Sequence, residues 1–102
     1  MIKIDLGKKD IIHFIGIGGI GMSGLAQIMK NMGFNVQGSD QGKNKNTTNC
    51  SKLGIKVFLG HSKKNLKKVS LIVKSSAIKS NNVEIDYAKK KKLPIYSRAD
   101  VL

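Results

Sequence analysis

Residues 11–24 read IIHFIGIGGIGMSG, and this stretch decides the fold of the chain. Its first half is a near-continuous apolar run, which is typical of a strand buried on both faces of a parallel sheet. Glycines at 16, 18 and 21 then satisfy the pattern G-x-G-x-x-G. After them, apolar residues recur at helical spacing, which predicts a helix with one buried face. A strand, a glycine turn and a helix in this order are the context in which the pattern binds a nucleotide phosphate.

Each glycine of the pattern has a physical task. Gly16 lets the chain turn sharply off the strand, Gly18 lets backbone N–H groups approach a phosphate, and Gly21 lets the helix pack close to the sheet. Gly19 adds another position without a side chain, and Ser23 adds a hydroxyl in the first turn of the helix. The helix N-terminus offers unpaired N–H groups and a partial positive charge to a pyrophosphate. A tight turn without a ligand is the alternative interpretation, and the pattern does not say which nucleotide binds.

The rest of the chain alternates short apolar runs with segments of helical character. We predict further strands at residues 34–38, 55–59, 70–74 and 95–96. Further helices are predicted to begin at Thr47 or Thr48 and at Asn82, the last with Val83 and Ala88 facing inward. This order predicts a Rossmann-like α/β fold, a parallel sheet of about five strands flanked by helices, in one domain that spans residues 1–102.

Polar side chains follow three of the predicted strands. Asp40 comes 19 residues after the last glycine of the pattern, near the place where a dinucleotide enzyme holds its ribose. A solvated turn carboxylate or a helix cap is the alternative for this residue. Ser75 and Ser76 follow the strand across the switch point of the sheet, where ligands of open α/β sheets bind, although serines are also common in turns. His61 lies at the same edge and could bind a base or a sugar, or be an exposed loop histidine, whereas His13 inside the first strand is predicted to be structural.

Composition limits the other classes of function. The net charge is +13, which normally suggests a polyanionic partner. However, only Arg98 among the 19 basic residues is arginine, and aromatic residues make up 5% of the chain. Because nucleic-acid recognition relies on arginine contacts and aromatic stacking, we expect no nucleic-acid partner.

The sequence contains no pattern that predicts a membrane span, a metal site or a catalytic centre. The apolar runs are too short for a membrane span, and the first ten residues lack the apolar core of a secretory signal. No cluster has metal-ligand spacing, and no nucleophile stands beside a base. The single cysteine, Cys50, favours a reducing compartment. We therefore expect a cytoplasmic protein with no membrane partner, no metal and no catalytic residue in this chain.

Several motifs together resemble the Mur ligases that act on UDP-N-acetylmuramate. The resemblance covers essentially residues 11–102 and rests on four stretches, which are His13 to Gly24, Gly38 to Asp40, Ser75 to Ile78 followed by Asn82, and Pro94-Ile95 followed by Arg98-Ala99. It implies that the chain is the N-terminal, UDP-binding domain of a three-domain enzyme. Such an enzyme uses ATP and magnesium to add L-alanine to the muramyl carboxylate in peptidoglycan synthesis. A related member, which attaches a recycled tripeptide to the same nucleotide sugar, remains an alternative.

The resemblance also implies which residues contact UDP. The predicted set places Gly16, Gly18, Gly19, Gly21, Met22 and Ser23 at the pyrophosphate, Asp40 at the uridine, and Ser75, Ser76, Ala77 and Ile78 along the other side of the nucleotide. His61 belongs to the set as a position that matches the family pattern. The chain contains no G-x-x-x-x-G-K-S/T segment, so the ATP site and magnesium ligands are expected beyond Leu102, and these residues alone should not ligate. From the residues themselves an NAD-binding module stays open, because the same turn and acid serve both nucleotides.

Overall fold

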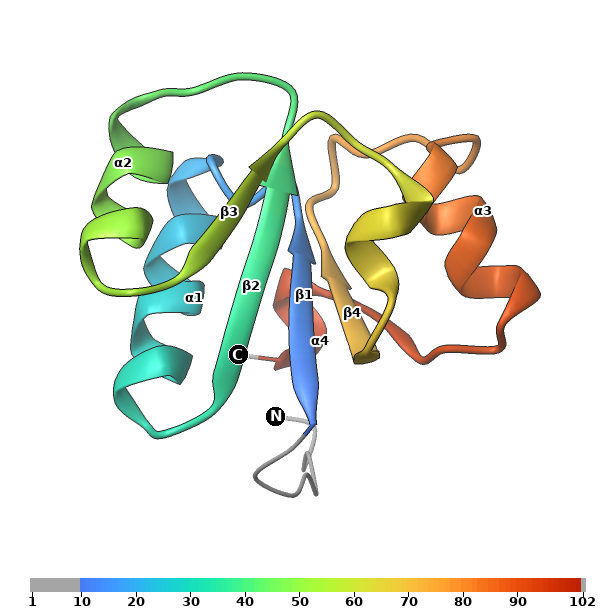
Figure 1. Cartoon of the computed structure of the whole chain (residues 1–102), viewed down its shortest axis with the longest axis horizontal. Coiled ribbons are helices and arrows are strands. Elements are labelled where there is room, and N and C mark those ends of the chain that lie inside the picture. Colours follow the sequence, from blue (N-terminus) through green and yellow to red (C-terminus); the bar gives the residue numbers. More distant parts are fainter. Residues whose placement is uncertain (1–9, 102) are drawn as a thin grey trace.

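Strand β1 (Ile11–Ile15) occupies the centre of the sheet, as its apolar run requires. The structure is a computed structural model in which residues 10–101 are described. Within that range five parallel strands form one sheet in the order β3-β2-β1-β4-β5 (Figure 1). The other strands are β2 (Asn35–Asp40), β3 (Lys56–Leu59), β4 (Val69–Lys74) and β5 (Ile95–Ser97). The predicted Rossmann-like α/β fold is confirmed.

Helices cover both faces of this sheet (Figure 1). On one face α1 (Ile20–Asn31), α2 (Lys45–Lys52) and α4 (Arg98–Val101) enclose the larger core, which includes Phe14 of β1. On the other face the 3₁₀ helix η1 (Lys63–Leu66) and α3 (Val83–Lys90) enclose a smaller core. Successive β1 residues therefore face different cores, and His13 points to the α3 side, where its ring meets α3.

Two local predictions were wrong. Helix α2 begins at Lys45 and is capped by Asn44, because Asn44 and Thr47 form a capping box in which each side chain accepts the other's backbone N–H at 2.8 Å. Helix α3 begins after Asn82 as predicted, but Val83 is 45% exposed and Glu84 is fully buried. Ala88 is buried as predicted, and Glu84 and Ile85 complete the inward face of α3, which carries a carboxylate into the protein.

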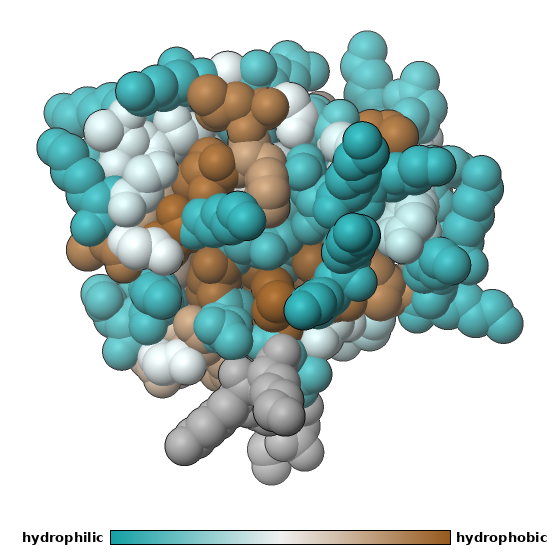
Figure 2. Space-filling model, viewed as in Figure 1, coloured by the Kyte–Doolittle hydropathy of each residue, from teal (hydrophilic) through white to brown (hydrophobic). Residues whose placement is uncertain are grey.

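The surface is polar with interspersed apolar areas. Figure 2 shows one face of the molecule, on which hydrophilic side chains surround smaller apolar patches. None of the helices among residues 10–101 is long and apolar enough to cross a lipid bilayer. The prediction about a secretory signal concerns residues 1–9 and Asp10, and all but Asp10 lie outside the described residues.

Candidate nucleotide-binding site

The glycine turn is anchored to the strands on both sides of β1. The N–H groups of Gly16 and Ile17 both donate to the carbonyl of Ser39 at the end of β2, at 2.9 and 3.0 Å. Gly16 has φ +84°, and a Cβ there would lie 3.2 Å from Ser75 Cβ and 3.3 Å from Ile78 Cδ1. Only glycine satisfies both the left-handed backbone and this close approach. The turn therefore sits at the switch point between β1 and β4.

Two adjoining hollows open at this edge of the sheet. The first, of about 330 Å³, takes in the largest share of the predicted site residues, namely Gly16, Gly18, Gly19, Asp40, His61, Ser75, Ala77 and Ile78, together with Gln41 and Asn44. The second, of about 400 Å³, is lined by Gly19, Ile20, Gly21, Met22, Ser75, Ser76, Ser97, Arg98 and Ala99. Gly19 and Ser75 border both hollows, so a ligand longer than one of them can extend into the other.

Ser23 is the predicted site residue that lines neither hollow. Its side chain is buried, and its hydroxyl donates to the carbonyl of Ile20 at 3.2 Å. The hydroxyl thus satisfies the first turn of α1 and is turned away from both hollows.

The start of α1 has the properties of an anion site. Gly19 is its N-cap and supplies no side-chain cap, and the first turn contains no acidic residue. The first bond of the helix runs from Ser23 N–H to the Gly19 carbonyl at 2.9 Å. Within residues 10–101, the N–H groups of Ile20, Gly21 and Met22 thus have no protein acceptor. Unpaired N–H groups and the helix dipole together favour a phosphate at this end.

Asp40 bonds to the turn itself. Its Oδ2 accepts the N–H of Gly18 at 2.7 Å, and its Oδ1 accepts the N–H of Gln41 at 2.8 Å. A Cβ on Gly18 would lie 2.8 Å from this Oδ2 and 2.9 Å from Asn44 Nδ2. The glycine therefore makes room for the Asp40 carboxylate and the start of α2, in addition to any room it leaves for a phosphate.

The task predicted for Gly21 is also different in the structure. A Cβ on this residue would lie 2.7 Å from Nε and 2.9 Å from Cζ of Arg98, so the space is filled by a guanidinium group from α4 and not by the sheet. Arg98 brings a positive charge to the helix N-terminus, beside the second hollow. The sequence signalled it only weakly, as the one arginine of the chain in a stretch that resembles the Mur ligases.

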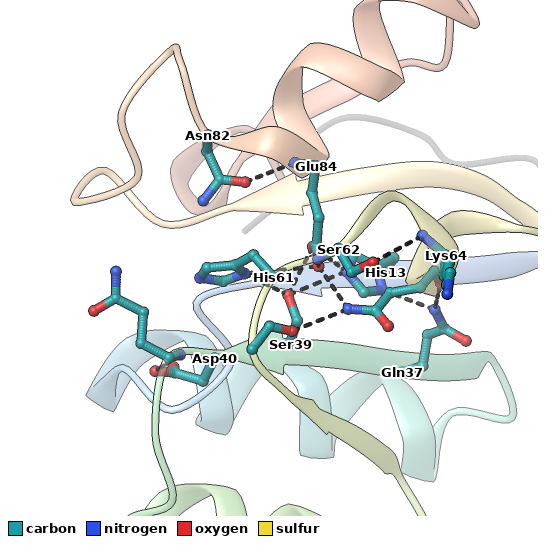
Figure 3. Close-up of polar contacts among 12 residues, drawn as sticks. His13, Gln37, Ser39, Asp40, His61, Ser62, Lys64, Asn82 and Glu84 are labelled. Atoms are coloured by element: carbon teal, nitrogen blue, oxygen red, sulfur yellow. Dashed lines mark hydrogen bonds and ion pairs between the residues drawn. The ribbon is translucent and has the colours of Figure 1, made fainter.

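Behind the first hollow lies a buried polar cluster that sequence reasoning missed (Figure 3). Its centre is Glu84, which is fully buried and is oriented by Asn82, whose side chain accepts the Glu84 N–H at 2.8 Å. Glu84 Oε1 accepts from His13 Nε2 and from Ser39 Oγ, both at 2.7 Å. Glu84 Oε2 accepts from Ser62 N–H at 2.9 Å and from Asn65 Nδ2 at 2.8 Å. We name these five residues, His13, Ser39, Ser62, Asn65 and Glu84, the Glu84 cluster.

The cluster keeps Glu84 ionised. Burial raises the pKa of this carboxyl, but the hydrogen bond and electrostatic attraction of His13, together with the hydrogen bonds from Ser39 and Asn65, outweigh burial and lower the pKa to about 2. The cluster links β1, β2, the loop after β3 and α3. Two of these elements reach the first hollow, since β2 contributes Asp40 and the loop after β3 contributes His61 to its lining. His13 is therefore structural, as predicted, and has a specific partner.

Metal binding has no visible basis in this region. Among residues 10–101 no group of three or more His, Cys, Asp or Glu side chains could hold a metal ion. The free cysteine, Cys50, is buried between α1 and α2, away from the two hollows.

A Rossmann-like sheet, a glycine turn at its switch point and a helix N-terminus without a side-chain cap are the features shared by Rossmann-type nucleotide-binding domains. Comparison with known families makes this specific, because residues 11–102 match the Mur ligase family, catalytic domain. The chain belongs to the Mur ligase family.

Individual relatives agree with this assignment. The chain is 60% identical over 100 residues to the UDP-N-acetylmuramate–L-alanine ligase of Pelagibacter ubique, covering 98% of this chain and 22% of that protein. It is 57% identical over 106 residues to the ligase of the same name from Rickettsia typhi, covering 100% and 21%. The chain thus spans about a fifth of the length of these curated relatives.

Solved structures show the same domain. The UDP-N-acetylmuramate-alanine ligase of Thermotoga maritima superimposes with a TM-score of 0.85 and 39% identity, covering 88% of this chain and 21% of that one. The UDP-N-acetylmuramate:L-alanyl-gamma-D-glutamyl-meso-diaminopimelate ligase of Neisseria meningitides gives a TM-score of 0.81 and 34% identity, covering 87% and 28%.

Proposed function

We propose that this chain binds the UDP moiety of UDP-N-acetylmuramate, as the N-terminal part of an ATP-dependent ligase that adds L-alanine to that nucleotide sugar. The observation that carries the proposal is the open N-terminus of α1, which faces two joined hollows containing all the predicted contact residues except Ser23. The names of the relatives at 60% and 57% identity support the L-alanine reaction over the attachment of a tripeptide.

Each part of the site has a role in this proposal. The free N–H groups at the start of α1, with Arg98 beside them, bind the pyrophosphate. Asp40 and His61 border the first hollow and bind the uridine, and Ser75 to Ile78 close its other side. The second hollow, which continues past Ser76 and Arg98, receives the sugar end of the ligand. The anion is thus held mainly by backbone amides and one guanidinium, and the many lysines are not needed for it.

The ligation chemistry belongs to other residues of such an enzyme. The described residues hold no phosphate-binding G-x-x-x-x-G-K-S/T loop and no metal cluster. We therefore assign ATP, magnesium and the amino acid to the remaining four fifths of the length found in the relatives. The setting we propose is the cytoplasm, which agrees with a single buried cysteine that forms no disulfide.

Replacing Gly18 by valine tests the site. The branched side chain would clash with the Asp40 carboxylate and with Asn44, so the glycine turn must move away from β2. The backbone N–H groups of the turn would then no longer be oriented toward the pyrophosphate. We expect the affinity for UDP, measured by titration calorimetry, to fall at least about tenfold, which is about 1.4 kcal/mol.

Gly24→Val is the matched control for this experiment. Gly24 lies on α1, the helix that follows the glycine turn, and a Cβ there would meet no atom within 4 Å. UDP should bind this variant as it binds the wild type. If Gly18→Val also bound UDP with wild-type affinity, the role assigned to the glycine turn would be refuted.

A further inference from the structure

The donors and acceptors in the hydrogen bonds of the Glu84 cluster can be assigned in only one way. The Glu84 carboxylate is ionised and can only accept, and its two oxygens already accept from four donors. Ser39 is one of these donors, at 2.7 Å, so its single hydroxyl proton is committed to Glu84 Oε1. Ser39 Oγ must therefore act as the acceptor in every other hydrogen bond it makes.

That commitment extends to His61. Its Nδ1 lies 2.9 Å from Ser39 Oγ and 3.7 Å from Glu84 Oε2. Because Ser39 has no proton left to donate, Nδ1 of His61 must carry the proton and donate to Ser39 Oγ. The proton of a neutral imidazole is then absent from Nε2, which keeps a free lone pair. His61 borders the first hollow, and Figure 3 shows its ring on the side of the cluster that faces Asp40.

The other histidine of the cluster is fixed the opposite way. His13 Nε2 lies 2.7 Å from Glu84 Oε1 and must donate to it. His13 Nδ1 lies 2.8 Å from Gln37 Nε2, and this amide nitrogen also donates to the Asn65 carbonyl at 2.7 Å, so it is a donor to the ring. The same carboxylate thus sets opposite tautomers in the two histidines.

We propose that Ser39 and Glu84 are positioning residues that hold His61 as the Nδ1–H tautomer, so that its Nε2 accepts a hydrogen bond from the nucleobase of the bound nucleotide. The second half of this statement rests on the proposed function. Uridine offers two kinds of neutral donor, the ribose hydroxyls and the imide N–H of uracil. Asp40 is placed like the ribose-binding acid of other Rossmann-like sites, which assigns the imide N–H to His61.

The tautomers can be read without any ligand. Long-range proton–nitrogen NMR spectra of the neutral histidines distinguish a protonated ring nitrogen from a bare one. We expect His61 with Nδ1 protonated and His13 with Nε2 protonated, so His13 is an internal comparison in the same spectrum. A wild-type His61 with Nε2 protonated would overturn the inference, whether or not the chain binds UDP.

Ser39→Ala removes the acceptor of His61 Nδ1 and leaves the carboxylate in place. We expect this variant to show a mixture of both His61 tautomers, an unchanged His13, and a UDP affinity lowered about three- to tenfold. An unchanged His61 tautomer in Ser39→Ala would contradict the positioning role. If Ser39→Ala does not fold, the UDP affinity of His61→Asn is measured instead. The asparagine amide can still donate a hydrogen bond to Ser39 Oγ, but it has no counterpart of His61 Nε2.

The ligand contact has its own test. UDP methylated at the uracil imide nitrogen lacks the donor, so we expect it to bind the wild type about tenfold more weakly than UDP. In His61→Asn, the methyl group should lower the affinity much less, because this variant already lacks the hydrogen bond between His61 Nε2 and the imide N–H. Equal binding of both nucleotides by the wild type would refute the base contact. Absence of any UDP binding would instead refute the proposed function and leave the tautomer result standing.

Discussion

Replacing Glu84 by glutamine is expected to lower the free energy of unfolding by about 3–5 kcal/mol, a large part of the total of a small domain. The carboxylate accepts from four donors, whereas an amide has one oxygen and places its NH₂ group against two of those donors. The buried cluster would then contain unpaired polar groups. Urea unfolding followed by circular dichroism measures the change, with the slope expected to stay near that of the wild type.

The matched control is Asp86→Asn on the same helix. Asp86 is 58% exposed and pairs with Lys90 at 3.2 Å, so its loss should cost less than about 0.5 kcal/mol. A loss below about 1 kcal/mol in Glu84→Gln would mean that the cluster contributes little to stability.

The same residue predicts how stability depends on pH. The folded-state pKa of Glu84, about 2, lies below its ordinary value of 4.5. A carboxyl with a lowered folded pKa stabilises the protein above its unfolded pKa, and the contribution disappears as the pH falls toward the folded pKa. We expect the wild type to lose about 3 kcal/mol between pH 5 and pH 2 for this reason. Glu84→Gln should lack that part of the slope in urea titrations across the same range.

Gly38→Ala is expected to be the second large effect, at about 2–3 kcal/mol of lost stability. A Cβ on Gly38 would lie 2.5 Å from Ile17 Cδ1, 2.7 Å from Ile17 Cβ and 2.8 Å from the Phe14 carbonyl oxygen. The last two atoms are not the ends of flexible side chains, so β1, β2 or the glycine turn must shift. Ile17 belongs to that turn, and UDP affinity should therefore fall together with stability.

Gly24→Ala controls for the loss of glycine flexibility. Its Cβ meets nothing within 4 Å, and alanine favours a helix over glycine by about 1 kcal/mol. Thermal unfolding should show Gly24→Ala at or above the wild-type stability and Gly38→Ala well below it. Similar unfolding temperatures for the two variants would contradict the contact between Gly38 and Ile17.

The fold could be predicted because its signals are local. The apolar run before Gly16, the helical spacing after Gly21 and the alternation of segments are each contained in a short window of sequence. The cap of α2 could not be placed, because Asn44 and Thr47 are both good N-cap residues and the structure uses them together. Boundaries of this kind depend on a geometry that several neighbouring residues satisfy equally well.

Sequence reasoning predicted the part of the candidate site that glycines and strand ends mark. It missed the residues whose contacts are with residues far away in the sequence. Glu84 stands 71 residues from His13, and at the start of a helix it looks like an exposed acid that favours the helix dipole. Its burial follows from donors in three other elements, which no local pattern reveals. Arg98 was missed as a neighbour of Gly21 for the same reason, since α4 follows the last strand and reaches α1 only in the folded chain.

An NMR titration of the ¹⁵N-labelled chain with UDP-N-acetylmuramate, and separately with NADH, tests the central claim most directly. We predict that UDP-N-acetylmuramate shifts the amide signals of residues 16–23, of Asp40 and of Arg98, and that it binds more tightly than NADH. Both hollows contribute to that pattern, and the signals of the exposed lysines should stay in place. Tighter binding of NADH, or shifts spread over the lysine-rich surface without those of the glycine turn, would contradict the account.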